Sequence, residues 1–171
     1  MLPSRNPSSL PTSQPSDSLI AEGFHDRFGQ FSPGGNNVRW TRERFGRLGL
    51  VMMHSGKGTS IKSSLVSKKV ILNAPSREFK VAVSFYANGH MGDGDGFCLD
   101  YASNIASGWT EAKCWRIGQD FETEKWYDQE EIQFGFNSID DILDFIRIRF
   151  RSDSDDDMDR IFLDKVDVRA I

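Results

Sequence analysis

Apolar and polar residues alternate along most of the chain after its first 18 residues, with the period of two that half-buried β-strands produce. The clearest example is residues 79–86, in which Phe, Val, Val and Phe alternate with Lys, Ala, Ser and Tyr. A second is residues 146–151, in which apolar residues alternate with Arg147, Arg149 and Arg151. We therefore predict a strand in each segment.

Further short apolar runs have the length and composition of strands. They lie at residues 20–24, 38–40, 48–53, 67–72, 97–101, 112–117, 131–136 and 161–168. Glycine, proline, serine and aspartate separate them, as in turns. Nine or ten short strands without a long amphipathic helix predict an all-β fold, a sandwich of two antiparallel sheets with jelly-roll topology. Residues 138–144 begin with an N-cap serine and are expected to form a turn or a single helical coil.

Residues 1–18 differ from the rest, because a Pro-Ser or Pro-Thr pattern recurs every four residues there. Proline at this spacing disrupts helix and sheet hydrogen bonding, so we predict a disordered linker followed by one domain over residues 19–171. Such tracts carry O-glycans on secreted stalks or serve as plain spacers. No secretory signal is recognisable. We expect part of a larger secreted protein, with a cytoplasmic protein as the alternative.

The overall charge of the chain limits the classes of ligand that it is expected to bind. The formal net charge is -4 and the isoelectric point about 5.4, which argues against duplex nucleic acid because phosphate binding requires clustered cations. One basic stretch, from Arg39 to Arg47, is expected to be solvated surface rather than a polyanion site. No run of 18 apolar residues occurs, so we predict no membrane insertion.

Two cysteines, Cys98 and Cys114, lie in predicted strands. In each strand the alternation places the cysteine on the face opposite the large apolar residues. The two could therefore face each other across adjacent antiparallel strands and form a disulfide, which would indicate an extracellular protein. Two free thiols in a reducing cell are the alternative.

Three segments resemble a known family. They are Glu22-Gly23-Phe24 with Phe28-Gly29-Gln30-Phe31, Gly96-Phe97-Cys98-Leu99-Asp100-Tyr101, and residues 159–168. They look like the first, central and last strands of jelly-roll carbohydrate-binding modules and of the related MAM-like adhesion domains. The resemblance implies a structural calcium held by acids of the first and last strands. Lys165 departs from the pattern, because it stands where the family has the second of two closing acids.

Two acids stand where the alternation predicts the core. Asp164 shares the phase of Phe162 and Val166, and Glu22 shares that of Phe24. A buried carboxylate without a partner is unfavourable by several kcal/mol, so each requires compensation. If the terminal strands pair, Glu22 and Asp164 could share a calcium ion. The alternatives are a β-bulge that turns one acid to solvent, or an arginine that neutralises it.

Two acidic loops are further candidates for calcium. In Gly92-Asp93-Gly94-Asp95-Gly96 the glycines would let carbonyls and the carboxylates of Asp93 and Asp95 converge on one ion. An ordinary flexible hairpin loop is the favoured alternative. The aspartates of residues 153–159 lack the glycine and the distal glutamate of an EF-hand. We expect a solvated acidic loop there.

Sugars bind to aromatic rings that stack on their apolar faces, with hydrogen bonds to the hydroxyls. Trp40, Trp109, Trp126 and Tyr127 are the candidates for such contacts. Packing into the core or over an edge of the sandwich is the alternative for each of the four. Trp115 is expected to lie in the core.

The motifs of common enzymes are absent, including His-Glu-x-x-His and Gly-x-Ser-x-Gly. A polysaccharide lyase that uses His54 or His90 with a tyrosine is the enzymatic alternative. The leading hypothesis is a non-catalytic, calcium-supported extracellular module that binds glycan. An adhesion module with a cell-surface or matrix protein as its partner is the second hypothesis.

Overall fold

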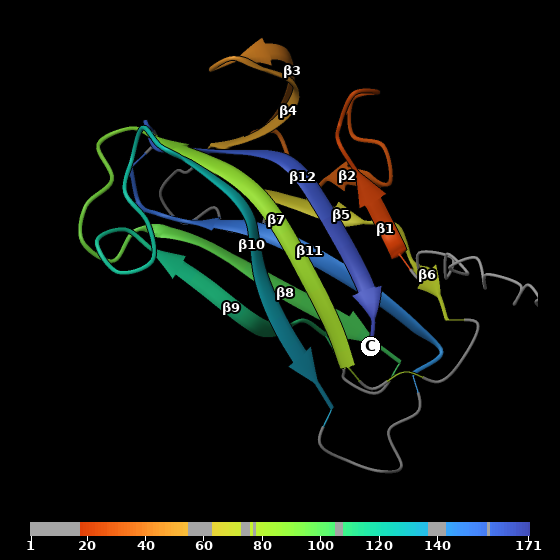
Figure 1. Cartoon of the computed structure of the whole chain (residues 1–171). Coiled ribbons are helices and arrows are strands. Elements are labelled where there is room, and N and C mark those ends of the chain that lie inside the picture. Colours follow the sequence, from red (N-terminus) through yellow and green to blue (C-terminus); the bar gives the residue numbers. More distant parts are fainter. Residues whose placement is uncertain are drawn as a thin grey trace, which may run out of the picture.

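The computed structural model describes residues 18–54, 63–72, 76, 78–104, 108–136, 143–156 and 158–171. These residues form twelve β-strands in two sheets, which lie as two layers in Figure 1. Every pair of neighbouring strands is antiparallel. The predicted two-sheet antiparallel β-sandwich is confirmed.

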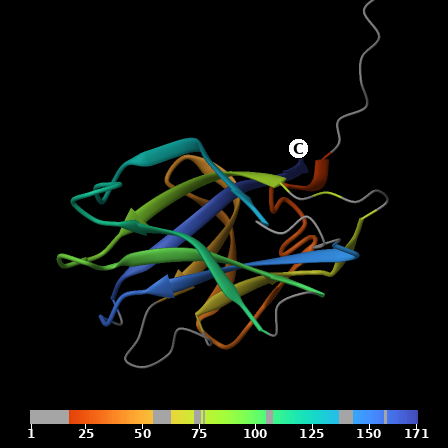
Figure 2. The same cartoon turned by 90° about the horizontal axis from the view of Figure 1, so that it is seen from below.

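Sheet A contains both ends of the described chain. Its order is β10-β7-β12-β4-β3, and β1 pairs with the second half of β12. The strands are β1 (Ser18–Glu22), β3 (Val38–Arg44), β4 (Arg47–His54), β7 (Glu78–Asn88), β10 (Trp126–Gly135) and β12 (Arg160–Ala170). Figure 2 shows β1 beside the C-terminal end. The expected pairing of the terminal strands is therefore confirmed.

Sheet B has the order β2-β5-β11-β8-β9, and the short β6 also pairs with β11. The strands are β2 (Phe31–Pro33), β5 (Ser64–Ser67), β6 (Val70–Ile71), β8 (Gly96–Ser103), β9 (Thr110–Arg116) and β11 (Phe145–Asp153). The sequence predicted one strand over residues 67–72, where the structure has β5 and β6, and it predicted no strand at β2. The expected turn or coil over residues 138–144 lies largely outside the described residues.

The main apolar core fills the space between the two sheets, and Phe85 of β7 lies near its centre. The Phe85 ring contacts the rings of Phe97, Trp115, Phe121 and Tyr127, with centroids 4.7, 6.2, 5.6 and 5.0 Å away. Burial of each large apolar side chain contributes about 1.5–3 kcal/mol. Trp115 is buried, as predicted.

A second apolar cluster lies on the outer face of sheet A. It consists of Leu50, Tyr86 and Phe162, with Phe45, Met52 and Trp126 packed against them. Phe45 lies between β3 and β4 and stacks on Tyr86 at 4.2 Å between centroids. The tip of the β3–β4 hairpin is thus held against the sheet. In the described part of the chain, no helix has the length and apolarity that a membrane crossing requires.

Candidate functional site

The outer face of sheet B carries a row of charged side chains. In β11, Ile148 and Phe150 are buried in the core, and the residues between and beside them face the other way. Arg147, Arg149 and Arg151 therefore form one row along the outer face. Residues of one strand face are about 6–7 Å apart, so the row with Asp153 extends over about 20 Å.

Asp100 of β8 holds two of these arginines. It lies opposite Arg149 in the register and is only 2% exposed. Arg149 donates hydrogen bonds to Oδ2 of Asp100 from Nε at 2.9 Å and from Nη2 at 2.6 Å. Arg151 donates to the same oxygen at 3.0 Å and to Oε2 of Glu111 at 2.6 Å. The buried carboxylate is thus compensated by two cations whose positions it fixes.

Trp109 lies at one end of this row, just before β9. The guanidinium of Arg149 lies over its ring at 4.5 Å from the centroid, and that of Arg147 at 5.6 Å. The side chain is half-buried and belongs to neither apolar cluster. Gly108 precedes it with a φ of 104°, a conformation that a residue with a side chain rarely adopts. Its ring is therefore held at the surface by cations rather than by the core.

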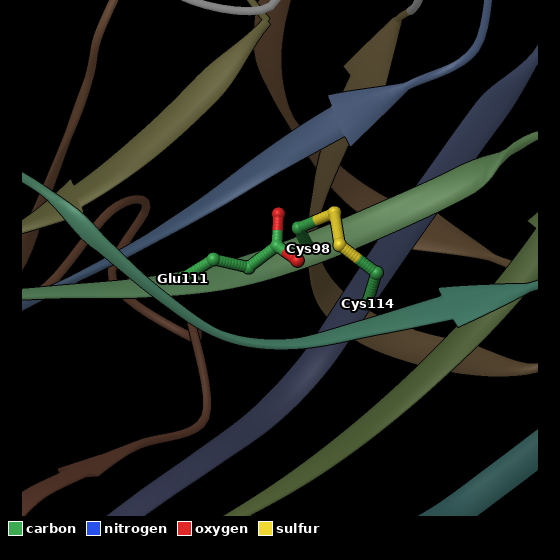
Figure 3. A group of neighbouring side chains, drawn as sticks. All are labelled: Cys98, Glu111 and Cys114. Atoms are coloured by element: carbon green, nitrogen blue, oxygen red, sulfur yellow. A yellow bond between two sulfur atoms is a disulfide. The ribbon is translucent and has the colours of Figure 1, made fainter.

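The disulfide lies beneath the other end of the row. Cys98 of β8 and Cys114 of β9 are directly opposite each other and bonded, with Cα atoms 4.0 Å apart. This is the arrangement that the alternation predicted. Figure 3 shows Glu111 beside the two sulfurs. Among the described residues these three form a close group of potential metal ligands, but both sulfurs are joined to each other and are not thiolates.

We call this surface the Trp109 platform; it consists of Trp109, Arg147, Arg149, Arg151, Asp100 and Glu111. It combines an aromatic ring, guanidinium donors and carboxylate acceptors, and salt bridges fix Arg149 and Arg151. Arg147 has no carboxylate partner among the described residues; its Nε lies 3.4 Å from the carbonyl oxygen of Ser67. Such a surface suits an extended ligand rich in hydroxyl groups.

The other three aromatic candidates have structural partners. Trp40 packs against the main core and donates a 2.7 Å hydrogen bond to the carbonyl oxygen of Phe24. Tyr127 stacks on Phe85, and its hydroxyl oxygen accepts the amide of Glu122. Trp126 belongs to the second apolar cluster on sheet A. Trp40 and Tyr127 therefore pack into the core, which was the alternative to ligand contact for these residues.

Glu22 organises the loop that follows β1. Its two carboxylate oxygens accept the backbone amides of Phe24 and Gln30, each at 2.9 Å. Gly29 lies against this carboxylate with a φ of 51°, and a Cβ there would be 1.7 Å from Oε2. The acid is therefore compensated by backbone donors, and Glu22 pairs with Val166 in the register.

Asp164 lies on the outer face of sheet A, on the side of Phe162, and the β-bulge between Leu163 and Lys165 then returns Val166 to the core. Its Oδ2 pairs with Nη1 of Arg47 at 2.6 Å. Of the two alternatives to calcium, the neutralising arginine occurs at this residue, whereas the bulge does not turn Asp164 to solvent, because the residue is only 4% exposed. In this arrangement Oδ2 of Asp164 already has a cationic partner in Arg47. Calcium binding stays a prediction.

Asp93 and Asp95 lie in the loop between β7 and β8. Oδ2 of Asp95 accepts the amide of Gly92 at 2.7 Å and closes a turn, while Asp93 is exposed. The loop lies near Asp159, whose carboxyl is fully buried. Burial raises the pKa of Asp159, and the charges of Asp95 and Asp156 raise it further. The structure thus brings together the two acidic loops that the sequence treated separately.

The enzymatic alternative requires a histidine beside a tyrosine. His54 lies at the end of β4, where Nε of Arg160 is 3.5 Å from its Nδ1. Burial and then the charge of Arg160 lower the pKa of His54. Among the described residues, no hydrogen bond joins His54 or His90 to a tyrosine.

Sequence reasoning found Trp109 but missed Asp100, Glu111 and the role of the arginines. The alternation of β11 showed that its arginines share one face, which was the available signal. Their partner Asp100 is 49 residues away from Arg149 in the chain, and only the register of β8 against β11 brings the two together.

No family model matches the sequence, and no curated protein sequence matches it. The fold, in contrast, is similar to solved structures. The CBM22-1 xylan-binding domain of Paenibacillus barcinonensis Xyn10C aligns with a TM-score of 0.62 and 12% identity, over 94% of this chain and 98% of that domain.

Two further structures are similar. The CBM22-1 and GH10 modules of Clostridium thermocellum xylanase 10B, complexed with xylohexaose, align with a TM-score of 0.59 and 16% identity, over 90% of this chain and 28% of that chain. A family 16 carbohydrate-binding module aligns with a TM-score of 0.52 and 15% identity, over 81% of this chain and 89% of that one. The structural neighbours are carbohydrate-binding modules, and this chain has their jelly-roll β-sandwich fold.

Proposed function

We propose that this chain is a non-catalytic module that binds a polysaccharide chain across the Trp109 platform, outside the cell. The observation that carries the proposal is the position of Trp109. Its ring packs against neither apolar cluster and lies at the surface beside arginines. Aromatic rings held in this way stack on the apolar faces of sugars.

The charged residues of the platform support the same function. The salt bridges of Asp100 hold Arg149 and Arg151 in place before any ligand arrives. Preorganised donors lose little conformational freedom on binding, which favours affinity. A row about 20 Å long suits several sugar residues of an extended chain better than a single small molecule.

The disulfide supports the location. A disulfide persists in oxidising compartments and is rare in the cytosol. The fold supports the absence of catalysis, since the neighbours with this fold are described as binding modules, one of them as a xylan-binding domain.

The test is binding of the full chain to a broad glycan array, in calcium and again in chelator. Trp109→Ala should weaken binding to the recognised glycans at least tenfold, and Trp109→Phe should weaken it less because a ring remains. Arg147→Ala should also weaken it. Arg42→Ala is the matched control, because Arg42 is an exposed arginine of β3 on the other sheet.

Binding to a related group of glycans that depends on Trp109 would support the proposal. Equal binding of glycan by Trp109→Ala and by the wild type would exclude the platform as the binding site. An absence of binding in both buffers would favour the alternative of an adhesion module with a protein partner.

A further inference from the structure

The outer face of sheet A has two β-bulges at the same level. In β12, Asp164 is the extra residue between Leu163 and Lys165. In β10, the register shifts between Tyr127 and Glu130. Both irregularities lie beside Ser84 of β7, the strand between β10 and β12. Bulges redirect side chains and are frequent beside functional sites.

The bulge of β10 contains a residue in an unusual conformation. Gln129 has a φ of 55°, in the left-handed region that residues other than glycine seldom occupy. Its backbone amide nitrogen donates a hydrogen bond to Oγ of Ser84 at 3.1 Å. A strained backbone of this kind persists only where surrounding contacts hold it, and it clusters at binding sites.

Arg47 of β4 joins the two bulges. Its Nη1 pairs with Oδ2 of Asp164 at 2.6 Å and with Oδ1 of Asp128 at 2.7 Å. Its Nη2 donates to Oδ2 of Asp128 at 2.8 Å. The guanidinium also lies over Trp126, with its carbon 3.8 Å from the ring centroid. The hydrogen bond from Arg47 is the main cause of a lowered pKa of Asp128.

Arg47, Asp128 and Asp164 line an open pocket of about 570 Å³. Small-molecule sites usually measure about 300–1,000 Å³. We call it the Arg47 pocket; its polar lining includes Arg47, Ser84, Asp128, Gln129, Asp164 and Lys165. Leu48, which is 57% exposed, adds an apolar surface at one side.

The lining indicates the class of ligand. Two cations, Arg47 and Lys165, balance two carboxylates, Asp128 and Asp164, so the charges of these four groups do not favour a charged ligand. His25, which also lines the pocket, adds an imidazole that can take part in hydrogen bonds. The lining thus combines donors and acceptors with one apolar side chain, Leu48. A sugar ring presents the complementary set, since its hydroxyl groups both donate and accept and its C–H face is apolar.

We propose that the Arg47 pocket is a second site, which binds a neutral oligosaccharide. The inference rests on the proposed carbohydrate-binding function for its ligand class, but it places binding on the opposite sheet and on different residues. Asp128 and Lys165 contact the sugar hydroxyls, and Asp164 positions Arg47.

Indole signals in NMR spectra separate the two sites. Trp126 lies under Arg47, and its Nε1 donates to the carbonyl oxygen of Phe45, so its indole proton reports on the pocket. The Trp109 indole reports on the platform. The full chain is titrated with xylohexaose, cellohexaose and mannohexaose as neutral probes, and with trigalacturonate as an acidic probe. Trp109→Ala and Trp126→Phe assign the two signals.

We expect a neutral probe to shift the Trp126 signal saturably, also in Trp109→Ala, where the platform is damaged. Asp128→Ala and Lys165→Ala should each weaken this binding at least tenfold. Lys165 is exposed and outside the core, so its variant tests the pocket even if Asp128→Ala folds poorly. Glu131→Ala is the matched control for Asp128→Ala. Glu131 is an exposed acid that lies in β10, like Asp128, and pairs with Lys80.

The inference is overturned if no neutral probe shifts the Trp126 signal, if only trigalacturonate does, or if Asp128→Ala and Lys165→Ala both bind as the wild type does. A response at Trp109 alone would leave the proposed function standing without the second site. A response at Trp126 alone would support binding in the Arg47 pocket and would exclude the Trp109 platform as a binding site.

Discussion

Arg149 reaches Asp100 through two hydrogen bonds to a single carboxylate oxygen, on the outer face of a sheet where that carboxylate is almost completely buried. The same guanidinium lies over the ring of Trp109. One arginine therefore links the buried acid of β8 to the aromatic residue at the surface.

Asp100→Ala should destabilise the fold strongly, because it leaves two half-buried arginines without their shared partner. Loss of one partner of a buried ion pair typically decreases the free energy of unfolding by about 3–5 kcal/mol. Glu111→Ala should change it by no more than about 1 kcal/mol, since the Glu111 side chain is 55% exposed. Urea denaturation of both variants checks the prediction, and equal losses would contradict it.

Gly29→Ala should destabilise the loop after β1 more than Gly46→Ala destabilises the β3–β4 hairpin. Both glycines have positive φ, 51° and 77°, so each substitution introduces left-handed strain of about 1–2 kcal/mol. At Gly29 the added Cβ also collides with the carboxylate of Glu22, whereas at Gly46 it meets no atom within 4 Å. Thermal melting of the two variants measures the difference. Equal melting temperatures would argue against the role of Glu22 in this loop.

Asp159 should make the fold less stable as the pH rises. Burial raises its folded-state pKa above the ordinary value of 3.8, so the folded chain holds this proton more tightly than the unfolded chain does. The stabilising effect of the proton is fully present below pH 3.8 and is lost as the pH rises through the raised pKa. Asp159→Asn, which stays neutral, should lack this part of the pH dependence and melt higher at pH 7. Parallel stability–pH curves for the two proteins would refute the assignment.

Calcium binding, predicted from Glu22 and Asp164, is tested by melting the chain in calcium and in chelator. If the ion binds there, calcium should raise the melting temperature, and Asp164→Ala should lower it and abolish the response. Arg47→Ala is informative as well, because it frees the Asp164 carboxylate from its cation. Equal melting temperatures of the wild type in calcium and in chelator would contradict the predicted calcium site.

The sequence was sufficient to predict most strands of the sandwich and the facing cysteines, because alternation specifies which side chains share a face. It missed the three-residue β2 and merged β5 with β6, because strands this short contain too few residues to show alternation. It did not reveal the bulge at Asp164, since one extra residue leaves the apolar pattern of β12 almost unchanged. The acid therefore looked as if it faced the core with Val166, although it lies on the outer face. The partners of Arg47 and Arg149 were also hidden, because they depend on strand register and not on local spacing.

The Trp109 platform and the Arg47 pocket lie on opposite outer faces of a sandwich whose sheets are about 10 Å apart. A straight polymer that follows one face leads away from the other, so the two surfaces cannot easily be filled by neighbouring units of one chain. A molecule occupied on both sides therefore joins two separate polymers. If both proposed sites bind glycan, such a module would cross-link a polysaccharide network and would raise the viscosity of a dilute glycan solution.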